Sequence, residues 1–226
     1  MSTCPICCRV TAIWACQPDS CGIALAVRPI QPIAAPMAGP LRDPTINRHL
    51  GFFLRPDLGL GFMATSEPTG TSAGNLTISG AAGVSGFVIG GAVQENIILG
   101  AHLYNGVVAN PTVSFSSGQS GTTSNTSLAM YGIGPEFTYY WMPSNIYFSG
   151  TVALTRMSMT VNGTSSDSNT GLGTRIALGK EWWVSDHWGL GLASHISLSS
   201  NRDGGDANAP TLTSWGFAVA FSATYN

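Results

Sequence analysis

Charged side chains are scarce in this chain of 226 residues. Only 9% of the residues are Asp, Glu, Lys or Arg, and Lys180 is the single lysine. Soluble domains carry about 25% charged residues and cover their water-facing surface with them. The shortage therefore predicts a protein with little surface in water. The net charge of −2, without any cluster of Lys and Arg, argues against a nucleic-acid partner.

Long apolar runs are missing as well. No stretch reaches the roughly 20 consecutive apolar residues that a membrane-spanning helix needs. One long charge-free run, 68–94, is rich in Gly, Ser and Thr and would form a poor helix. A membrane helix is therefore excluded. The 28 glycines instead fit the strongly curved strands of a narrow barrel.

From residue 48 onward the connections between apolar segments alternate in length. The short ones are 94–96, 143–145 and 185–187, and the long polar ones are 66–77, 111–126, 162–170 and 199–210. These connections divide the segment 48–226 into eight strands. Short turns at one end and long loops at the other are typical of a transmembrane β-barrel, whose turns face the periplasm and whose loops face outside.

Large apolar residues alternate with small or polar ones within the predicted strands. In the last strand Trp215, Phe217 and Val219 fall on one face. Ser214 and Gly216 fall on the other, because successive side chains of a strand point to opposite sides of the sheet. A soluble barrel needs a bulky apolar interior, so we expect the large residues to face lipid here.

The same alternation turns a set of charged and ionisable side chains towards the lumen: Arg55, Asp57, His102, Glu136, Arg175, Glu181 and His195. Side chains fill the interior of an eight-stranded barrel, and buried charges persist there when they are paired and hydrogen-bonded. We expect a charge network that plugs the lumen; the alternative is a narrow ion or proton path. Pro56 and Pro135 lie inside strands and predict bulges or local bends.

Four tryptophans flank the short turns: Trp141, Trp182, Trp183 and Trp188. Indole rings are amphipathic and prefer the level of the lipid headgroups. The cluster therefore predicts an aromatic girdle at one membrane interface.

With these features the segment 48–226 resembles the small eight-stranded outer-membrane barrels of the OmpA and OmpX kind. Its closing pattern Ser214-x-Gly216-x-x-Val219-x-Phe221 is similar to the signal that the outer-membrane insertion machinery reads in that family, although the chain continues to Asn226. The resemblance implies an all-β, antiparallel, up-and-down transmembrane barrel in the outer membrane of a Gram-negative-type cell. It also implies a monomer whose partners are outer-membrane lipid, lipopolysaccharide and the insertion machinery.

Residues 1–47 have a different composition. They hold all five cysteines, followed by a Pro/Ala-rich run over 28–44. Cys4, Cys7, Cys16 and Cys21 could supply four thiolates to zinc, but their spacing is irregular. The odd number of cysteines argues against a disulfide framework, and no signal peptide is recognisable. We expect a disordered extension, or one that is not the natural export signal, without a metal site.

One pair of residues could carry chemistry. His195-x-Ser197 is similar to the His-x-Ser pair of outer-membrane lipid A deacylases, in which a following Glu orients the histidine. No Glu follows Glu181 in this sequence. We therefore expect a non-enzymatic barrel with a structural or surface-interaction role and no cofactor. The alternatives are a small ion-conducting pore and a lipid A-modifying hydrolase that uses His195 and Ser197.

Overall fold

The computed structural model describes residues 48–72, 74–204 and 209–226, and its regular elements there are β-strands. Eight of these strands are long: β1 (Phe52–Pro68), β2 (Asn75–Gln94), β3 (Ile97–Ala109), β6 (Thr126–Trp141), β7 (Ile146–Val161), β9 (Gly171–Trp183), β10 (Trp188–Arg202) and β11 (Thr211–Tyr225). No helix in these ranges is long and apolar enough to cross a membrane. The predicted extension 1–47, with its cysteines, lies outside the described residues.

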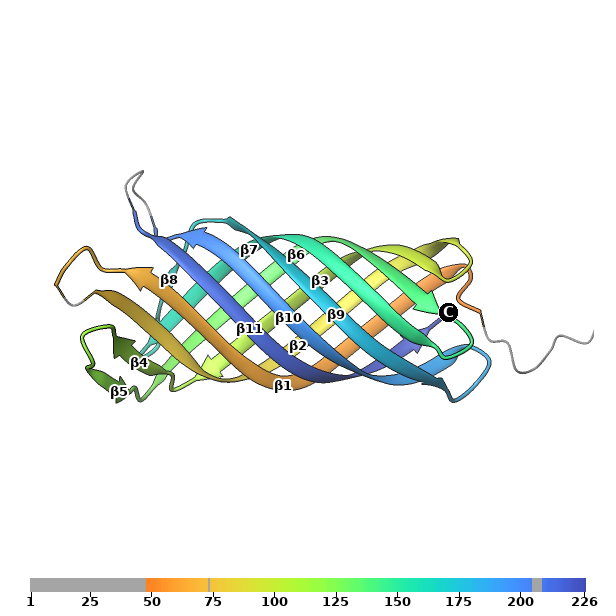
Figure 1. The fold of residues 1–226 in the computed structure, drawn as a ribbon, viewed down its shortest axis with the longest axis horizontal. Coiled ribbons are helices and arrows are strands. Elements are labelled where there is room, and N and C mark those ends of the chain that lie inside the picture. Colours follow the sequence, from red (N-terminus) through yellow and green to blue (C-terminus); the bar gives the residue numbers. More distant parts are fainter. Residues whose placement is uncertain (1–47, 73, 205–208) are drawn as a thin grey trace, which may run out of the picture. The chain divides into compact units, whose positions relative to one another are not determined.

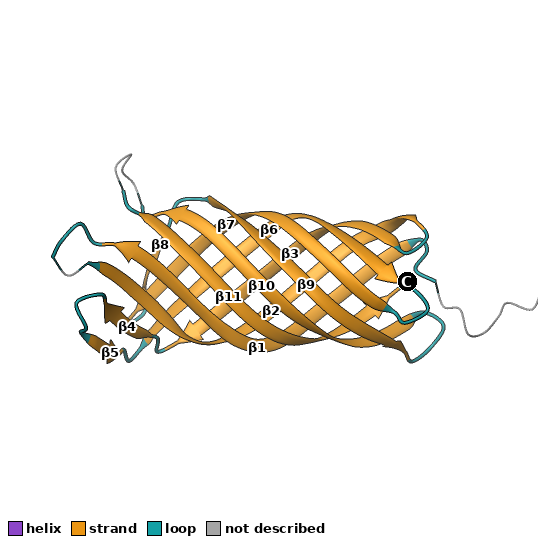
Figure 2. Cartoon of the chain, viewed as in Figure 1, coloured by secondary structure: helices purple, strands orange, loops and turns teal. Residues whose placement is uncertain are grey.

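The eight long strands close into a barrel (Figures 1 and 2). Around the wall their order is β1-β11-β10-β9-β7-β6-β3-β2, and β1 also pairs with β2. Every neighbouring pair is antiparallel. The prediction of an all-β, eight-stranded, antiparallel, up-and-down barrel is confirmed.

The two ends of the barrel differ as the connection lengths predicted (Figure 1). Three tight turns and the C-terminus lie at one end, which we call the turn end. The long connections lie at the other, which we call the loop end. Two of these loops contain additional short strands that the sequence did not predict: β4 (Thr112–Phe115) extends the sheet beside β2, β5 (Ser120–Thr122) pairs with β4, and β8 (Thr164–Asp167) pairs with β7.

The predicted facing of the side chains is confirmed. Leu58 and Leu60 on β1 are 71% and 77% exposed, and Phe217 and Phe221 on β11 are exposed as well. The alternate position Ala220 is buried. Large apolar side chains thus cover the outer surface of the barrel, while small and polar ones point inward.

The two strand prolines do not form bulges, so this part of the prediction is wrong; the local bends stay a prediction. Pro56 pairs with Phe87 of β2, and Pro135 pairs with Ala101 of β3, in an unbroken register. The ladder to the opposite neighbour is interrupted for two residues at each proline and resumes in the same register. A proline lacks the N–H that a strand donates to one neighbour, and here the wall simply omits the hydrogen bonds on that side.

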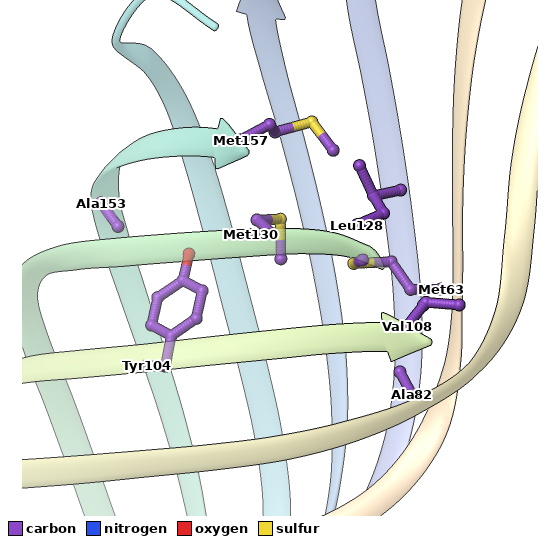
Figure 3. Close-up of a cluster of buried hydrophobic side chains, with 8 residues drawn as sticks. All are labelled: Met63, Ala82, Tyr104, Val108, Leu128, Met130, Ala153 and Met157. Atoms are coloured by element: carbon purple, nitrogen blue, oxygen red, sulfur yellow. The ribbon is translucent and has the colours of Figure 1, made fainter. Parts of the chain in front are cut away.

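The inner face holds two apolar clusters. The one near the loop end is rich in methionine and contains Met63, Ala82, Tyr104, Val108, Leu128, Met130, Ala153 and Met157 (Figure 3). The other contains Phe53, Val88, Ile98, Tyr140, Tyr147, Ala177 and Ala193. Flexible methionine side chains suit an irregular, narrow interior. Polar side chains lie between the two clusters.

Candidate functional site

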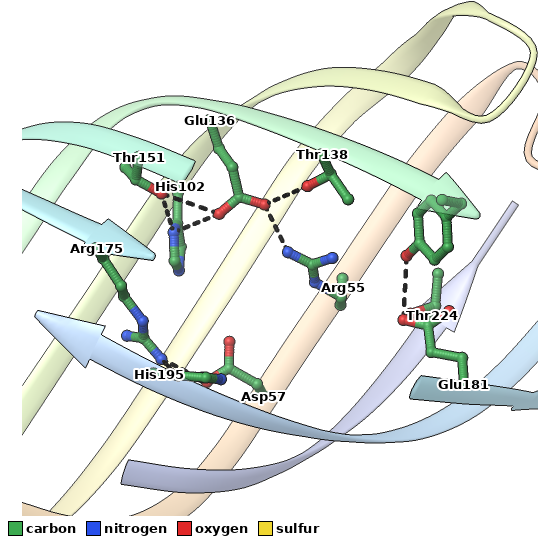
Figure 4. Close-up of polar contacts among 11 residues, drawn as sticks. Arg55, Asp57, His102, Glu136, Thr138, Thr151, Arg175, Glu181, His195 and Thr224 are labelled. Carbon is green, nitrogen blue, oxygen red and sulfur yellow. Dashed lines mark hydrogen bonds and ion pairs between the residues drawn. The ribbon is translucent and has the colours of Figure 1, made fainter. Parts of the chain in front are cut away.

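Glu136 on β6 is the centre of the first polar group in the lumen (Figure 4). Its Oε1 lies 2.5 Å from Nη2 of Arg55, and its Oε2 lies 2.7 Å from Nδ1 of His102. The hydroxyls of Thr138 and Thr151 donate to the same carboxylate at 2.8 and 3.0 Å. Four side chains thus surround one buried anion, as a charge in a dry interior requires.

Arg175 on β9 is the centre of the second group. Its Nη2 lies 3.2 Å from Oδ1 of Asp57 and also contacts Nδ1 of His195. The guanidinium carbon lies 5.1 Å from the ring centre of Tyr104, within the range of a cation–π contact. The structure thus brings six of the seven predicted lumen residues into two adjoining groups.

Glu181 is the seventh, and it is separate from both ion pairs. Its Oε1 accepts hydrogen bonds from the hydroxyls of Tyr140, at 3.1 Å, and Thr224, at 2.6 Å. No cation of the described chain lies within salt-bridge distance of it, and its Oε2 has no hydrogen-bond partner there. This carboxylate is held by hydroxyl groups alone.

The two ion pairs together cross the lumen. Arg55 and Asp57 are inward-facing neighbours on β1, but their partners lie in opposite directions around the wall. Glu136 is three strands away through β2 and β3, and Arg175 is three strands away through β11 and β10. One strand therefore anchors a bar of paired charges that spans the interior.

At the turn end the lumen is closed by contacts that the sequence pattern did not predict. His49 is fully buried, and its ring stacks on that of Tyr140 with a centroid distance of 3.5 Å. Its Nδ1 lies 2.9 Å from Oδ1 of Asn226, and its Nε2 lies 2.9 Å from Oδ1 of Asn145. Strand alternation could not place His49, because β1 begins at Phe52 and Gly51 has a φ of 80°, which extended backbone does not adopt.

The pair predicted as a possible nucleophile and base faces the lumen. His195 and Ser197 lie on the inner side of β10 and border a cavity of about 20 Å³, room for about one water molecule. The ring of His195 contacts Arg175, and no hydrogen bond joins it to Ser197 within the described residues. A general base has to reach the proton of its nucleophile, and the ring of His195 is directed to Arg175 instead.

The tryptophans of the predicted girdle divide into two kinds. Trp141, Trp182 and Trp188 are exposed on the outer surface at the turn end. Trp183 is only partly exposed, and its ring lies 5.0 Å from that of buried His49. The prediction that Trp183 belongs to the outer girdle is therefore wrong. Trp182 points outward, so the next residue along the strand, Trp183, points inward. A membrane interface at the level of the other three stays a prediction.

No protein-family model matches the chain, and no curated protein sequence matches it. Among solved structures, Neisserial surface protein A matches with a TM-score of 0.50 and 15% sequence identity, covering 77% of this chain and 96% of its own. OprG from Pseudomonas aeruginosa matches with a TM-score of 0.44 and 12% identity, covering 80% and 99%. The outer membrane protein AlkL in lipid bilayers matches with a TM-score of 0.44 and 15% identity, covering 78% and 90%. The likeness to the Neisserial protein concerns the fold, and the fold of this chain is that of the small outer-membrane β-barrels.

Proposed function

We propose that this chain is a non-enzymatic barrel in the outer membrane of a Gram-negative-type cell, with a plugged lumen and polar loops exposed outside. Its apolar outer surface supports contact with membrane lipid. Its alternating connections support a turn end in the periplasm and a loop end outside. The partners we propose are outer-membrane lipid, lipopolysaccharide and, during biogenesis, the insertion machinery, and we propose that the barrel is a monomer.

The proposal of a plugged lumen rests on the two ion pairs that cross the interior, Arg55–Glu136 and Arg175–Asp57. Arg55 and Arg175 each lie buried against a carboxylate. An ion that passed through the lumen would have to separate these pairs. Because the paired side chains are buried, water could not solvate the separated charges, and breaking a buried pair costs about 3–5 kcal/mol. The role of the barrel then lies in its wall and loops and not in transport through the lumen.

Conductance in planar bilayers tests this proposal. The unaltered protein is expected to give no steady current, and the double variant Arg55→Ala/Arg175→Ala is expected to give an open-channel current. Arg48→Ala is the matched control, because Arg48 forms an exposed ion pair with Glu95 outside the bar. Large, stable currents from the unaltered protein would show that the barrel is a pore.

The hydrolase alternative is tested separately by incubating the protein with lipopolysaccharide and measuring released fatty acids. No release is expected, because His195 and Ser197 face the lumen and a lipid would approach the opposite face of β10. Release that disappears in Ser197→Ala would contradict the proposal.

A further inference from the structure

A row of polar side chains crosses the outer surface of four neighbouring strands. Ser85 on β2 pairs directly with Asn105 on β3, Asn105 pairs with Tyr131 on β6, and Tyr131 pairs with Arg156 on β7. Residues directly opposite each other in a sheet project to the same side, so these four groups form one continuous line. We call it the polar row.

An apolar row runs beside it, one outward position closer to the turn end. Phe87 pairs with Leu103, Leu103 with Ile133, and Ile133 with Leu154. Both rows border the same groove, which has a volume of about 600 Å³. Ligand pockets commonly measure about 300–1,000 Å³. The outer wall therefore has a hollow of ligand size, apolar on its turn side and polar on its loop side.

The polar row is rich in hydrogen-bond donors. The hydroxyl of Ser85 donates to the side-chain amide oxygen of Asn105 at 2.7 Å. The amide N–H groups of Asn105 have no partner within the described chain and can donate to a ligand. Tyr131 contributes a hydroxyl and Arg156 a guanidinium. A guanidinium binds phosphate oxygens through two parallel hydrogen bonds, and neighbouring neutral donors add to such a site.

Arg156 is available for an exchange of partners. Its Nη2 lies 3.0 Å from Oδ2 of Asp167 on β8, and the two side chains are 58% and 43% exposed. Exposed ion pairs of this kind contribute little stability. A phosphate can therefore take the place of Asp167, or share the guanidinium with it.

We propose that the groove binds one phosphorylated, acylated glycolipid of the outer leaflet, of the lipid A type. Its phosphate lies on the polar row, and one acyl chain lies along the apolar row. The order of the rows supports this ligand, because a lipid of the outer leaflet has its headgroup towards the loop end and its chains towards the turn end. The inference rests on the proposed membrane position of the barrel.

Native mass spectrometry of the protein in detergent, with added lipid A that carries two phosphates, tests the site. The unaltered protein is expected to keep one lipid A. Arg156→Gln is expected to weaken binding about tenfold, as the loss of a charge-assisted hydrogen bond implies, whereas Asp167→Asn is expected to strengthen it. Lys180→Gln is the matched control, since Lys180 is an outward cation of the same sheet near the turn end.

Two further ligands separate the contributions of headgroup and chain. Dephosphorylated lipid A is expected to bind weakly, and inorganic phosphate at millimolar concentration is expected not to displace the lipid. Equal binding by Arg156→Gln, equal loss in Lys180→Gln, or displacement by free phosphate would each overturn the inference. Folding of the same preparation into vesicles is measured in parallel. A barrel that folds there without retaining lipid A contradicts only this site, whereas failure to fold contradicts the proposed function itself.

Discussion

Removing the negative charge of Glu136 is the sharpest perturbation that the lumen offers. Glu136→Gln conserves the size of the side chain and keeps a carbonyl oxygen that can accept from Thr138 or Thr151. It removes the charge that faces Arg55 at 2.5 Å. The guanidinium would then stay buried without its counter-ion, beside the ring of Tyr147 at 4.4 Å.

The size of the effect follows from the burial of the pair. The side chains of Arg55 and Glu136 are 4% and 1% exposed, so water does not replace the lost partner. Breaking a buried ion pair on one side costs about 3–5 kcal/mol, because the remaining charge is left uncompensated. We expect Glu136→Gln to lower the free energy of unfolding by that amount. Adding Arg55→Met in the same chain is expected to restore most of it, since an apolar replacement of a whole pair is often nearly neutral.

Equilibrium unfolding by urea in lipid vesicles, followed by tryptophan fluorescence, measures this difference. Glu181→Gln is the matched control, because it alters a carboxylate that is equally buried but bound by hydroxyl groups alone. We expect it to change the free energy of unfolding by less than about 1 kcal/mol. A loss in Glu181→Gln as large as that in Glu136→Gln would refute the argument, since burial and not pairing would then set the cost.

Three other outcomes test the wall and its orientation. Leu192→Arg on the outer surface is expected to make the free energy of folding into vesicles less favourable by about 2–4 kcal/mol, whereas Ala193→Ser on the inner face is tolerated. A stable detergent-free form of the unaltered protein would contradict a lipid-facing wall. Gly134→Ala places a Cβ against the Val152 carbonyl oxygen and is expected to cost about 1–3 kcal/mol in the same unfolding assay, whereas Gly150→Ala enters open space and should match the parent. A cysteine placed at Ser117 in a long loop is expected to react with a membrane-impermeant reagent on intact cells, and protection there would reverse the topology.

The strand pattern was predictable because it depends on local parity. Once Leu58 and Leu60 are taken as outward, Arg55 and Asp57 must point inward, and the structure agrees. The extent of strands into the loops was not predictable in this way. β8 carries polar residues on both faces, so its pairing with β7 leaves no periodic apolar signal.

Which inward side chains pair in the lumen depends on the tilt and stagger of the strands, and the alternation of large and small residues in the sequence does not give these. Arg55 meets Glu136 and not Glu181 because strand tilt and stagger set which inward positions share a level across the barrel. The error at Trp183 has the opposite cause, because the alternation does contain its direction. Its position beside a turn suggested an interface residue, whereas its parity with Glu181 turns it inward onto His49.

The contact of His49 with Asn226 joins residues that are 177 positions apart, beside the pairing of β1 with β11 that closes the wall. Contacts of such long sequence separation form slowly, because much of the chain must be ordered before they can be made. Until β11 is in place, β1 and β10 each have an edge of unpaired N–H and C=O groups, which hydrocarbon cannot satisfy. In the proposed membrane position, β1 and β10 are therefore satisfied only when β11 completes the seam between them, which makes closure of the wall an all-or-none step.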